Sequence, residues 1–168
     1  AEVEQAVFDG FVEITLLGQN VNSYNYKDIR FHQLLEEVAK IQGLKRIRYT
    51  SPHPQDITND LLITMANHDN ICNHVHLPLQ AGSDRILNRM NRTYSRDQFI
   101  KLAKMIRELV PNCGISTDII VGFPGETDDE FKKTLDVMEE IKFDSAFTFK
   151  YSPRRGTKAA EYGDQIIN

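Results

Sequence analysis

Five short polar segments of this sequence combine glycines, prolines, amides, hydroxyls and charged side chains, which are the groups that bind polar ligands. Each segment directly follows a run of apolar, often β-branched residues, a pattern typical of a buried strand. Any one of these segments, taken alone, has the composition of an ordinary turn. Ligands of parallel α/β sheets bind beyond the carboxyl ends of the strands, so five segments there predict a site for a polar, extended ligand. The segments are residues 18–20, 50–54, 78–83, 122–127 and 151–157.

The segment Gly122-Phe123-Pro124-Gly125-Glu126-Thr127 precedes a helical pattern. Its glycines allow a close approach of backbone amides, and a helix N-terminus favours an anion. The acidic residues Glu126, Asp128 and Asp129 would repel a phosphate, and the Gly-Lys-Ser/Thr ending of a P-loop is missing. Two interpretations of Glu126 remain, which are binding of an amine or ribose hydroxyl, and stabilisation of the helix start.

The histidines and cysteines predict no metal site. His74 and His76 share one face of a strand, but no third ligand stands at a metal-binding spacing. His53, between two prolines, is the better functional candidate. Cys72 and Cys113 form neither a disulfide framework nor a Cys-x2-Cys pair, and such scarce cysteines fit a reducing cytoplasm.

Composition places the chain among folded, water-soluble proteins. It has 168 residues, 40% hydrophobic and 26% charged, which predicts one ordinary domain. No apolar run approaches the roughly 18 residues of a membrane span, and the first residues do not resemble a signal peptide.

The formal net charge of −4 lacks the basic excess of an isolated nucleic-acid binder. Contacts to phosphate must therefore be local. Two groups of cations qualify, and each has the alternative of being a solvated face. They are Arg85, Arg89, Arg92 and Arg96, interrupted by a helix break at residues 91–95, and Arg154, Arg155 and Lys158.

Periodicity predicts an α/β fold with a largely parallel sheet. Predicted strands cover residues 12–17, 46–50, 75–79, 115–121 and 146–151, and predicted helices cover 2–10, 31–42, 59–67, 84–90, 96–109 and 128–141. Capping boxes at Ser95 with Gln98 and at Thr127 with Glu130 mark two helix starts.

Five strands are too few for an eight-stranded barrel. A small doubly wound sheet, a partial barrel and a piece of a larger barrel remain open. The opening helix and a polar tail, residues 154–168, without a packing pattern favour the piece.

At these motifs the sequence resembles the radical S-adenosylmethionine (SAM) methylthiotransferases over nearly its whole length. The Pro-Leu-Gln and Gly-Phe-Pro-Gly-Glu-Thr segments are general within this group. Residues 18–24 and 50–54 resemble most the branch that acts on N6-dimethylallyladenosine in tRNA. The matching segments are residues 16–24, 50–54, 76–83 with 90–94, 117–127, and 143–149 leading into 151–154.

The resemblance implies a partial, TIM-like (β/α)6 barrel of the radical SAM type, truncated at its first βα unit. Residues 1–168 would run from the first barrel helix through the sixth strand. The N-terminal cluster domain, the Cys-x3-Cys-x2-Cys loop and the C-terminal RNA-binding domain would lie outside. The whole protein would carry two 4Fe–4S clusters. The two cysteines of this chain, Cys72 and Cys113, do not match the positions of the cluster ligands. We expect the fragment itself to be inactive and to contain no catalytic residue.

The resemblance also assigns roles to residues of the five segments. Residues expected to contact SAM are Gly18, Gln19 and Asn20 at its amino group, Gln80, Gly82 and Ser83 at its ribose and carboxylate, Asp118, Gly122 and Glu126 near adenine and ribose, and Thr50 and Ser51 in the cavity. Residues expected on the substrate side are His53, Tyr151, Arg154 and Arg155.

The implied function is transfer of a methylthio group to C2 of N6-dimethylallyladenosine in the tRNA anticodon loop by radical SAM chemistry. The implied partners are tRNA and a reducing electron donor, with no membrane, in the cytoplasm. Alternatives are a sister methylthiotransferase for threonylcarbamoyladenosine or a ribosomal protein, a non-catalytic α/β cofactor-binding module, and an α/β hydrolase or isomerase using His53 and Glu126. The last lacks a Gly-x-Ser-x-Gly nucleophile motif.

Overall fold

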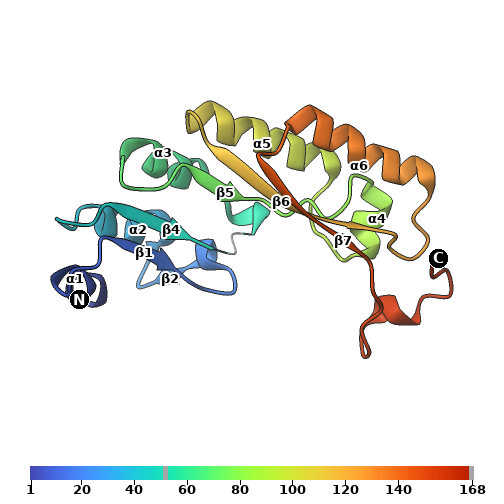
Figure 1. The fold of residues 1–168 in the computed structure, drawn as a ribbon, viewed down its shortest axis with the longest axis horizontal. Coiled ribbons are helices and arrows are strands. Elements are labelled where there is room, and N and C mark those ends of the chain that lie inside the picture. The colour runs from blue at the N-terminus through green and yellow to red at the C-terminus, as the bar shows by residue number, and fades with distance from the viewer. Residues whose placement is uncertain (51–52, 167–168) are drawn as a thin grey trace. The chain divides into compact units, whose positions relative to one another are not determined.

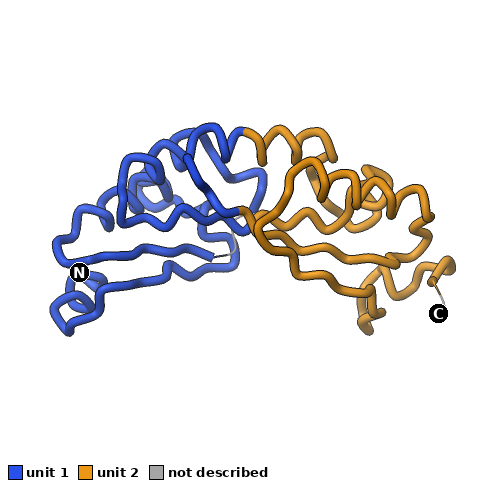
Figure 2. Tube along the Cα trace, turned by 45° about the horizontal axis from the view of Figure 1, so that its top comes forward, with its two compact units in different colours: residues 1–76, 105–114 blue, residues 77–104, 115–168 orange. Residues whose placement is uncertain are grey.

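The computed structural model describes residues 1–50 and 53–166. The chain divides into two compact units (Figures 1 and 2). Unit 1 comprises Ala1–His76 and Met105–Gly114, and unit 2 comprises Leu77–Lys104 and Ile115–Asn168. Each unit is described by itself.

Unit 1 alternates short strands with helices. Parallel strands β1 and β4 pair in the register Ile14↔Ile47, and the register brings Glu13 of β1 beside Arg46 and Arg48 of β4. Its elements are α1 (Glu2–Phe8), β1 (Glu13–Leu16), η1 (Val21–Ser23), β2 (Asn25–Tyr26), β3 (Ile29–Arg30), α2 (Phe31–Ala39), β4 (Arg46–Tyr49), η2 (Pro54–Asp56), α3 (Asn59–Asn67) and β5 (His74–His76).

The core of unit 1 follows from helical periodicity. Helix α2 buries Phe31, Leu35 and Val38, which share one face because they are spaced by three to four residues. Helix α3 buries Leu61 and Met65 in the same way. Both helices contact Tyr49 at the end of β4: the Phe31 ring meets the Tyr49 ring edge to face at 5.3 Å, and the Tyr49 hydroxyl donates to the Met65 sulfur at 3.2 Å.

Unit 2 is built on β6, which pairs in parallel with β7. Gln80 adds a single parallel bridge to Ile119 on the other side of β6. Strand β6 is buried on both faces over Ile115, Ser116 and Thr117, as is typical of a central strand in a parallel sheet. The remaining elements are α4 (Asp84–Arg89), α5 (Arg96–Leu109), β6 (Gly114–Val121), α6 (Asp128–Ile141), β7 (Ser145–Lys150) and η3 (Lys158–Glu161). The end of α5 from Met105 onward and the first residue of β6 belong to unit 1.

Both predicted capping boxes are confirmed. At α6, the Thr127 hydroxyl accepts the Glu130 N–H at 3.3 Å, and the Glu130 carboxylate accepts the Thr127 N–H at 3.0 Å. At α5, Ser95 and Gln98 exchange the same two hydrogen bonds. The predicted break at residues 91–95 is also present, because α4 ends at Arg89 before α5 begins.

The polar tail, which has no packing pattern in the sequence, nevertheless packs against unit 2 over its described residues. After β7 the chain forms η3 and then folds back on the loop that follows β6, with Tyr162 and Asp164 making the contacts. A second difference is the hairpin of β2 and β3, where the sequence analysis predicted no strands. Both features depend on single side chains and a tight turn, which leave no periodic pattern.

Candidate functional site

Unit 2 contains a cavity of 590 Å³ at the ends of β6 and β7. Asp118 and Ile120 of β6 lie opposite Phe147 and Phe149 of β7, and this register places alternate residues of both strands on one face. The cavity therefore combines a carboxylate with apolar side chains. Its lining consists of Gln80, Asp118, Ile120, Phe149, Lys150, Tyr151, Ser152, Arg154, Thr157 and Ala159.

Gln80 is the most unusual residue of this cavity. Its backbone adopts a left-handed conformation with φ 68°, which is strained for a residue other than glycine. The backbone is held there because its N–H donates to Asp118 at 2.8 Å and its carbonyl accepts from Ile120 at 2.9 Å. Gln80 is only 6% exposed, and it lines the cavity together with Asp118. Residues held in such strained backbone conformations cluster at ligand sites and active sites.

Glu126 closes the loop in which it lies. One carboxylate oxygen accepts the Gly122 N–H at 2.6 Å, whereas the other is buried without a partner in the described part of the chain. Burial raises the pKa of Glu126, and the bonds from the Gly122 and Phe123 backbone partly oppose this increase. This geometry favours a role in shaping the loop.

Aromatic contacts connect this loop to the cavity. The Phe123 ring meets the Tyr151 ring edge to face at 5.1 Å, and Tyr151 lines the cavity. The Tyr151 hydroxyl is buried and finds no partner among the residues described. Loop 122–126 thus contacts a cavity wall, although Gly122 and Glu126 do not line the cavity themselves.

Gly82 and Ser83 face helix α6 instead of the cavity. The Gly82 N–H donates to the Thr134 hydroxyl at 2.8 Å, and a Cβ at Gly82 would collide with the α6 backbone. The Ser83 hydroxyl donates to Glu130 at 2.9 Å. The structure does not bring these two predicted cofactor contacts to the cavity, because both residues fasten the helix to the loop after Gln80.

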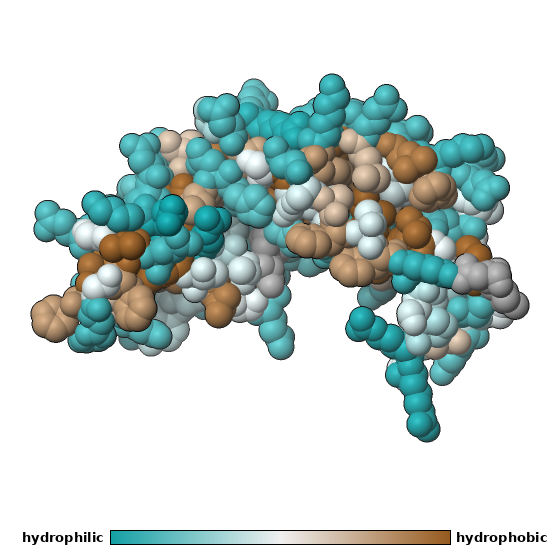
Figure 3. Space-filling model, in the orientation of Figure 1, coloured by the Kyte–Doolittle hydropathy of each residue, from teal (hydrophilic) through white to brown (hydrophobic). Residues whose placement is uncertain are grey.

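The two cation groups differ in their pairing. Arg85 pairs with Glu130 and Arg89 pairs with Asp164, so both bind within the chain. Arg154 and Arg155 are exposed, and Arg154 lines the cavity. Figure 3 shows long hydrophilic side chains projecting from the C-terminal part of unit 2. This second group remains available to an anionic ligand.

Two of the predicted residues of unit 1 line a different cavity, of 720 Å³. Gly18 and Asn20 line it together with apolar residues of β1 and α1. The exposed Gln19 directly follows Gly18. Thr50 donates its N–H to Leu16 at 3.2 Å, and Ser51 lies outside the described residues. Unit 1 and unit 2 therefore each carry one group of the predicted residues.

Side-chain amides connect the two polar loops of unit 1. Asn20 donates to the Asp56 carboxylate at 2.6 Å, and Asn22 accepts the His53 N–H at 2.9 Å. The His53 ring nitrogen Nδ1 accepts the Gln55 N–H at 3.3 Å and caps η2. In this structure, Asn20 and His53 therefore shape the loops.

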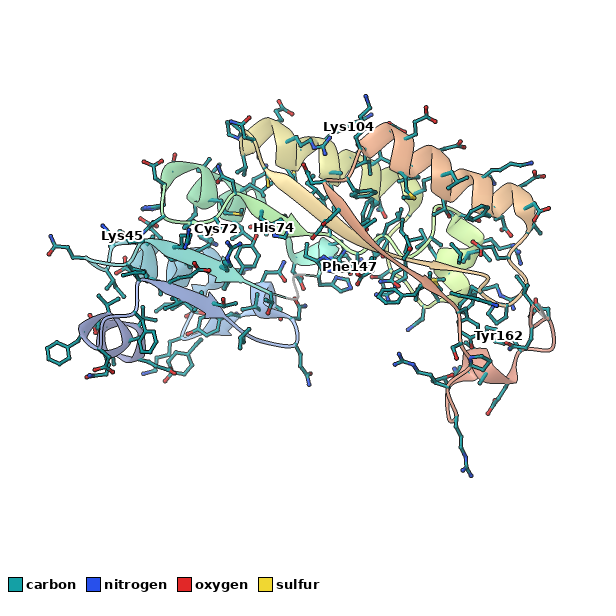
Figure 4. The ribbon with its side chains drawn as sticks, in the orientation of Figure 1. Lys45, Cys72, His74, Lys104, Phe147 and Tyr162 are labelled. Atoms are coloured by element: carbon teal, nitrogen blue, oxygen red, sulfur yellow. The ribbon has the colours of Figure 1, made fainter. Side chains whose placement is uncertain are left out.

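Among the described residues, no group of three or more His, Cys, Asp and Glu side chains could hold a metal ion. Cys113 is buried, and Cys72 is half-buried near His74 in Figure 4. The described helices include none with the length and apolar character needed to cross a membrane.

The sequence analysis missed several residues that line the unit 2 cavity. Ile120 and Phe149 lie two positions from Asp118 and Tyr151, so strand alternation could have found them. Thr157 lies within the predicted segment 151–157, whereas Ala159 gave no signal because it lies beyond that segment. The missed residues are Ile120, Phe149, Lys150 and Ala159.

Comparison with known proteins agrees with these features. The model of the Radical SAM superfamily matches residues 1–138. This chain belongs to the Radical SAM superfamily. It is 48% identical to the tRNA-2-methylthio-N(6)-dimethylallyladenosine synthase of Caldicellulosiruptor saccharolyticus and 52% identical to that of Acetivibrio thermocellus. Each match covers 98% of this chain, which spans 36% and 35% of the two relatives.

Solved structures confirm the predicted radical SAM type of fold. Coproporphyrinogen III oxidase from Escherichia coli aligns with 98% of this chain and 40% of its own, at a TM-score of 0.65 and 16% identity. The radical SAM methyltransferase TsrM from Kitasatospora setae aligns with 89% of this chain and 29% of its own length, at a TM-score of 0.67 and 15% sequence identity. Such distant likeness establishes the fold alone.

Proposed function

We propose that this chain is the SAM-binding core of a tRNA methylthiotransferase that acts on C2 of N6-dimethylallyladenosine. The observation that carries the proposal is the nearly buried Gln80, held in a left-handed backbone conformation beside Asp118 in the unit 2 cavity. The superfamily match and the names of relatives with about half of their residues identical support it. The same names favour this substrate over threonylcarbamoyladenosine and a ribosomal protein.

The cavity fits SAM in size and chemistry. Its 590 Å³ lies within the roughly 300–1,000 Å³ typical of small-molecule sites. The Asp118 carboxylate can accept from ribose hydroxyls, and the Gln80 amide can both donate and accept. Ile120 and Phe149 offer apolar contact to the adenine ring. In this proposal Gln80 and Asp118 orient the nucleoside, and the apolar pair excludes water.

A cofactor supplies the difficult chemistry in this superfamily, namely one-electron reductive cleavage of SAM by a 4Fe–4S cluster. We place the ligands of this cluster, and those of a second one, in the part of the longer protein that this chain does not span. The unit 1 residues Gly18, Gln19, Asn20 and Thr50 are proposed to contact SAM as well. Their contribution is binding and orientation.

The substrate side is proposed to include Tyr151, Arg154 and Arg155. The two arginines are exposed next to the cavity, and guanidinium groups bind phosphates well. Since the chain as a whole carries net charge −4, these local cations would guide the tRNA while other parts of the longer protein supply most of the affinity. A reducing electron donor and a cytoplasmic location complete the proposal.

The test uses the full-length protein with reconstituted clusters. We expect Gln80→Ala and Asp118→Ala each to weaken SAM binding about tenfold, which equals about 1.4 kcal/mol. Isothermal titration measures the affinity, and iron content shows whether clusters assemble normally. Gln42→Ala is the matched control, because Gln42 is exposed and lies outside the cavity. Unchanged SAM affinity in both cavity variants would contradict the site.

The substrate is tested separately. The wild-type protein should add a methylthio group to tRNA that carries N6-dimethylallyladenosine, and mass spectrometry of the digested tRNA detects the product. Threonylcarbamoyladenosine tRNA and ribosomal protein should remain unmodified. The isolated 168-residue chain should show no activity and weak or no SAM binding, because the iron that anchors the methionine is supplied elsewhere.

A further inference from the structure

The segment after β7 forms a strap, residues 157–166, that touches both the cavity and loop 122–126. Thr157 and Ala159 at its beginning line the cavity. Farther along, the Tyr162 ring lies 4.5 Å from the Arg89 guanidinium and 6.3 Å from the Phe123 ring. Figure 4 labels Tyr162 within this C-terminal part of unit 2. The strap therefore reaches from the cavity to the loop whose Phe123 contacts Tyr151 of the cavity lining.

Gly125 is fixed at both of its backbone polar groups. Its N–H donates to the Asp164 carbonyl at 2.8 Å, and its carbonyl accepts from Arg85 at 2.5 Å. The Asp164 carboxylate also pairs with Arg89 at 2.7 Å. The fit around Gly125 is close, because a Cβ there would collide with the Asp164 carboxylate, and its φ of 72° favours glycine.

The strap is held in shape by its own hydrogen bonds. The Gln165 amide donates to the Ala159 carbonyl at 2.8 Å and to the Tyr162 carbonyl at 3.0 Å. These bonds tie the part that lines the cavity to the part that holds the loop. The strap can therefore act as one unit.

We infer that the strap positions the SAM cavity of unit 2 by holding loop 122–126 through Tyr162 and Asp164. The contacts run from Tyr162 to Phe123, and from Phe123 to Tyr151, which lines the cavity. This inference rests on the proposed function. Tyr162 and Asp164 are positioning residues, because neither lines the cavity.

Loss of the strap contacts should change SAM affinity more than the chemical step. Energetic coupling between two distinct sites of a protein typically changes affinity by about 5–150-fold, and we use this range as a guide. We expect Asp164→Ala and Tyr162→Ala each to raise the KM for SAM about tenfold, in the lower part of that range. The kcat should stay close to wild type, because neither Tyr162 nor Asp164 lines the cavity.

The experiment compares these variants in the full-length, cluster-loaded protein. Glu161→Ala is the matched control, because Glu161 is an exposed acid of the same strap and loses the same charge. Tyr162→Phe keeps the ring and should restore nearly normal SAM affinity. If Asp164→Ala and Tyr162→Ala bind SAM within twofold of wild type, or if Glu161→Ala weakens it equally, the inference is wrong.

A second test works from the other side of the contact. Gly125→Ala should weaken SAM binding, because the new methyl group meets Asp164. Because Gly125→Ala and Asp164→Ala disturb the same contact, the double variant should bind SAM no more weakly than the weaker of the two single variants. Losses that simply add in the double variant would overturn the inference. Failure of the wild-type protein to bind SAM would instead refute the proposed function.

Discussion

Replacing Glu130 by glutamine should destabilise the chain at neutral pH and make its stability less sensitive to acid. The nearly buried Glu130 carboxylate accepts hydrogen bonds from the Ser83 hydroxyl, from Arg85 and from the Thr127 N–H. These bonds, chiefly that from Arg85, lower the pKa of Glu130 from 4.5 to about 2. The variant keeps the shape of the side chain but loses its charge.

The magnitude follows from the pKa. At about 1.4 kcal/mol per pKa unit, the Glu130 carboxylate contributes about 3 kcal/mol to stability. Arg85 is 50% exposed, and solvent screening of this half-exposed partner reduces the expected loss to about 2 kcal/mol. Because the folded-state pKa is below the unfolded one, the contribution is complete above pH 4.5 and is lost as the pH falls towards 2.

Urea unfolding of the chain and of Glu130→Gln at several pH values between 7 and 3 measures this contribution. The difference in free energy of unfolding should be about 2 kcal/mol at pH 7 and about half of that or less at pH 3. Asp129→Asn is the control, since its exposed pair with Lys132 should contribute less than about 1 kcal/mol. A difference that is below about 0.5 kcal/mol at pH 7, or that does not shrink in acid, would refute the reasoning.

Two further predictions concern the backbone. The β2–β3 turn places Lys27 and Asp28 at φ 50° and 65°, so Lys27→Asn with Asp28→Gly should raise the free energy of unfolding by about 1 kcal/mol in urea titrations. No gain would show that the turn is not strained. Gly82→Ala should cost about 3 kcal/mol or more in the same assay, because its Cβ would meet the backbone at Thr134. A cost below about 1 kcal/mol would mean that α6 can move away.

The helices could be predicted because their signals are local. Residues 59–67, 96–109 and 128–141 match α3, α5 and α6 at both ends. Capping side chains fix the start of each helix, and apolar periodicity determines the length. Strand ends were less accurate: residues 75–79 were predicted where β5 covers His74–His76. Strand bounds depend on pairing with distant residues, which the local sequence does not contain.

The candidate site could be predicted only at the level of its loops. The segment that contains Gln80 and Gly82 illustrates the reason. Gln80 lines the cavity with a left-handed backbone, whereas Gly82 turns towards α6, although the two residues are only two positions apart. A polar segment after a strand predicts that some residue will reach the ligand. Which one does so depends on the backbone turn, and only the structure reveals that turn.

The strap shows why a tail that looks unstructured can still be packed. Its attachment relies on one ring, Tyr162, and one acid, Asp164, each of which meets the same partner, Arg89. Such contacts join residues far apart in sequence and repeat with no period, so a search for amphipathic patterns cannot find them. The signal was Gly125, which the sequence analysis assigned to a close approach of a ligand. In the structure the chain itself occupies that space, because the carbonyl of Asp164 accepts the Gly125 N–H. A glycine that permits close approach therefore does not reveal by itself whether a ligand or another part of the chain comes close.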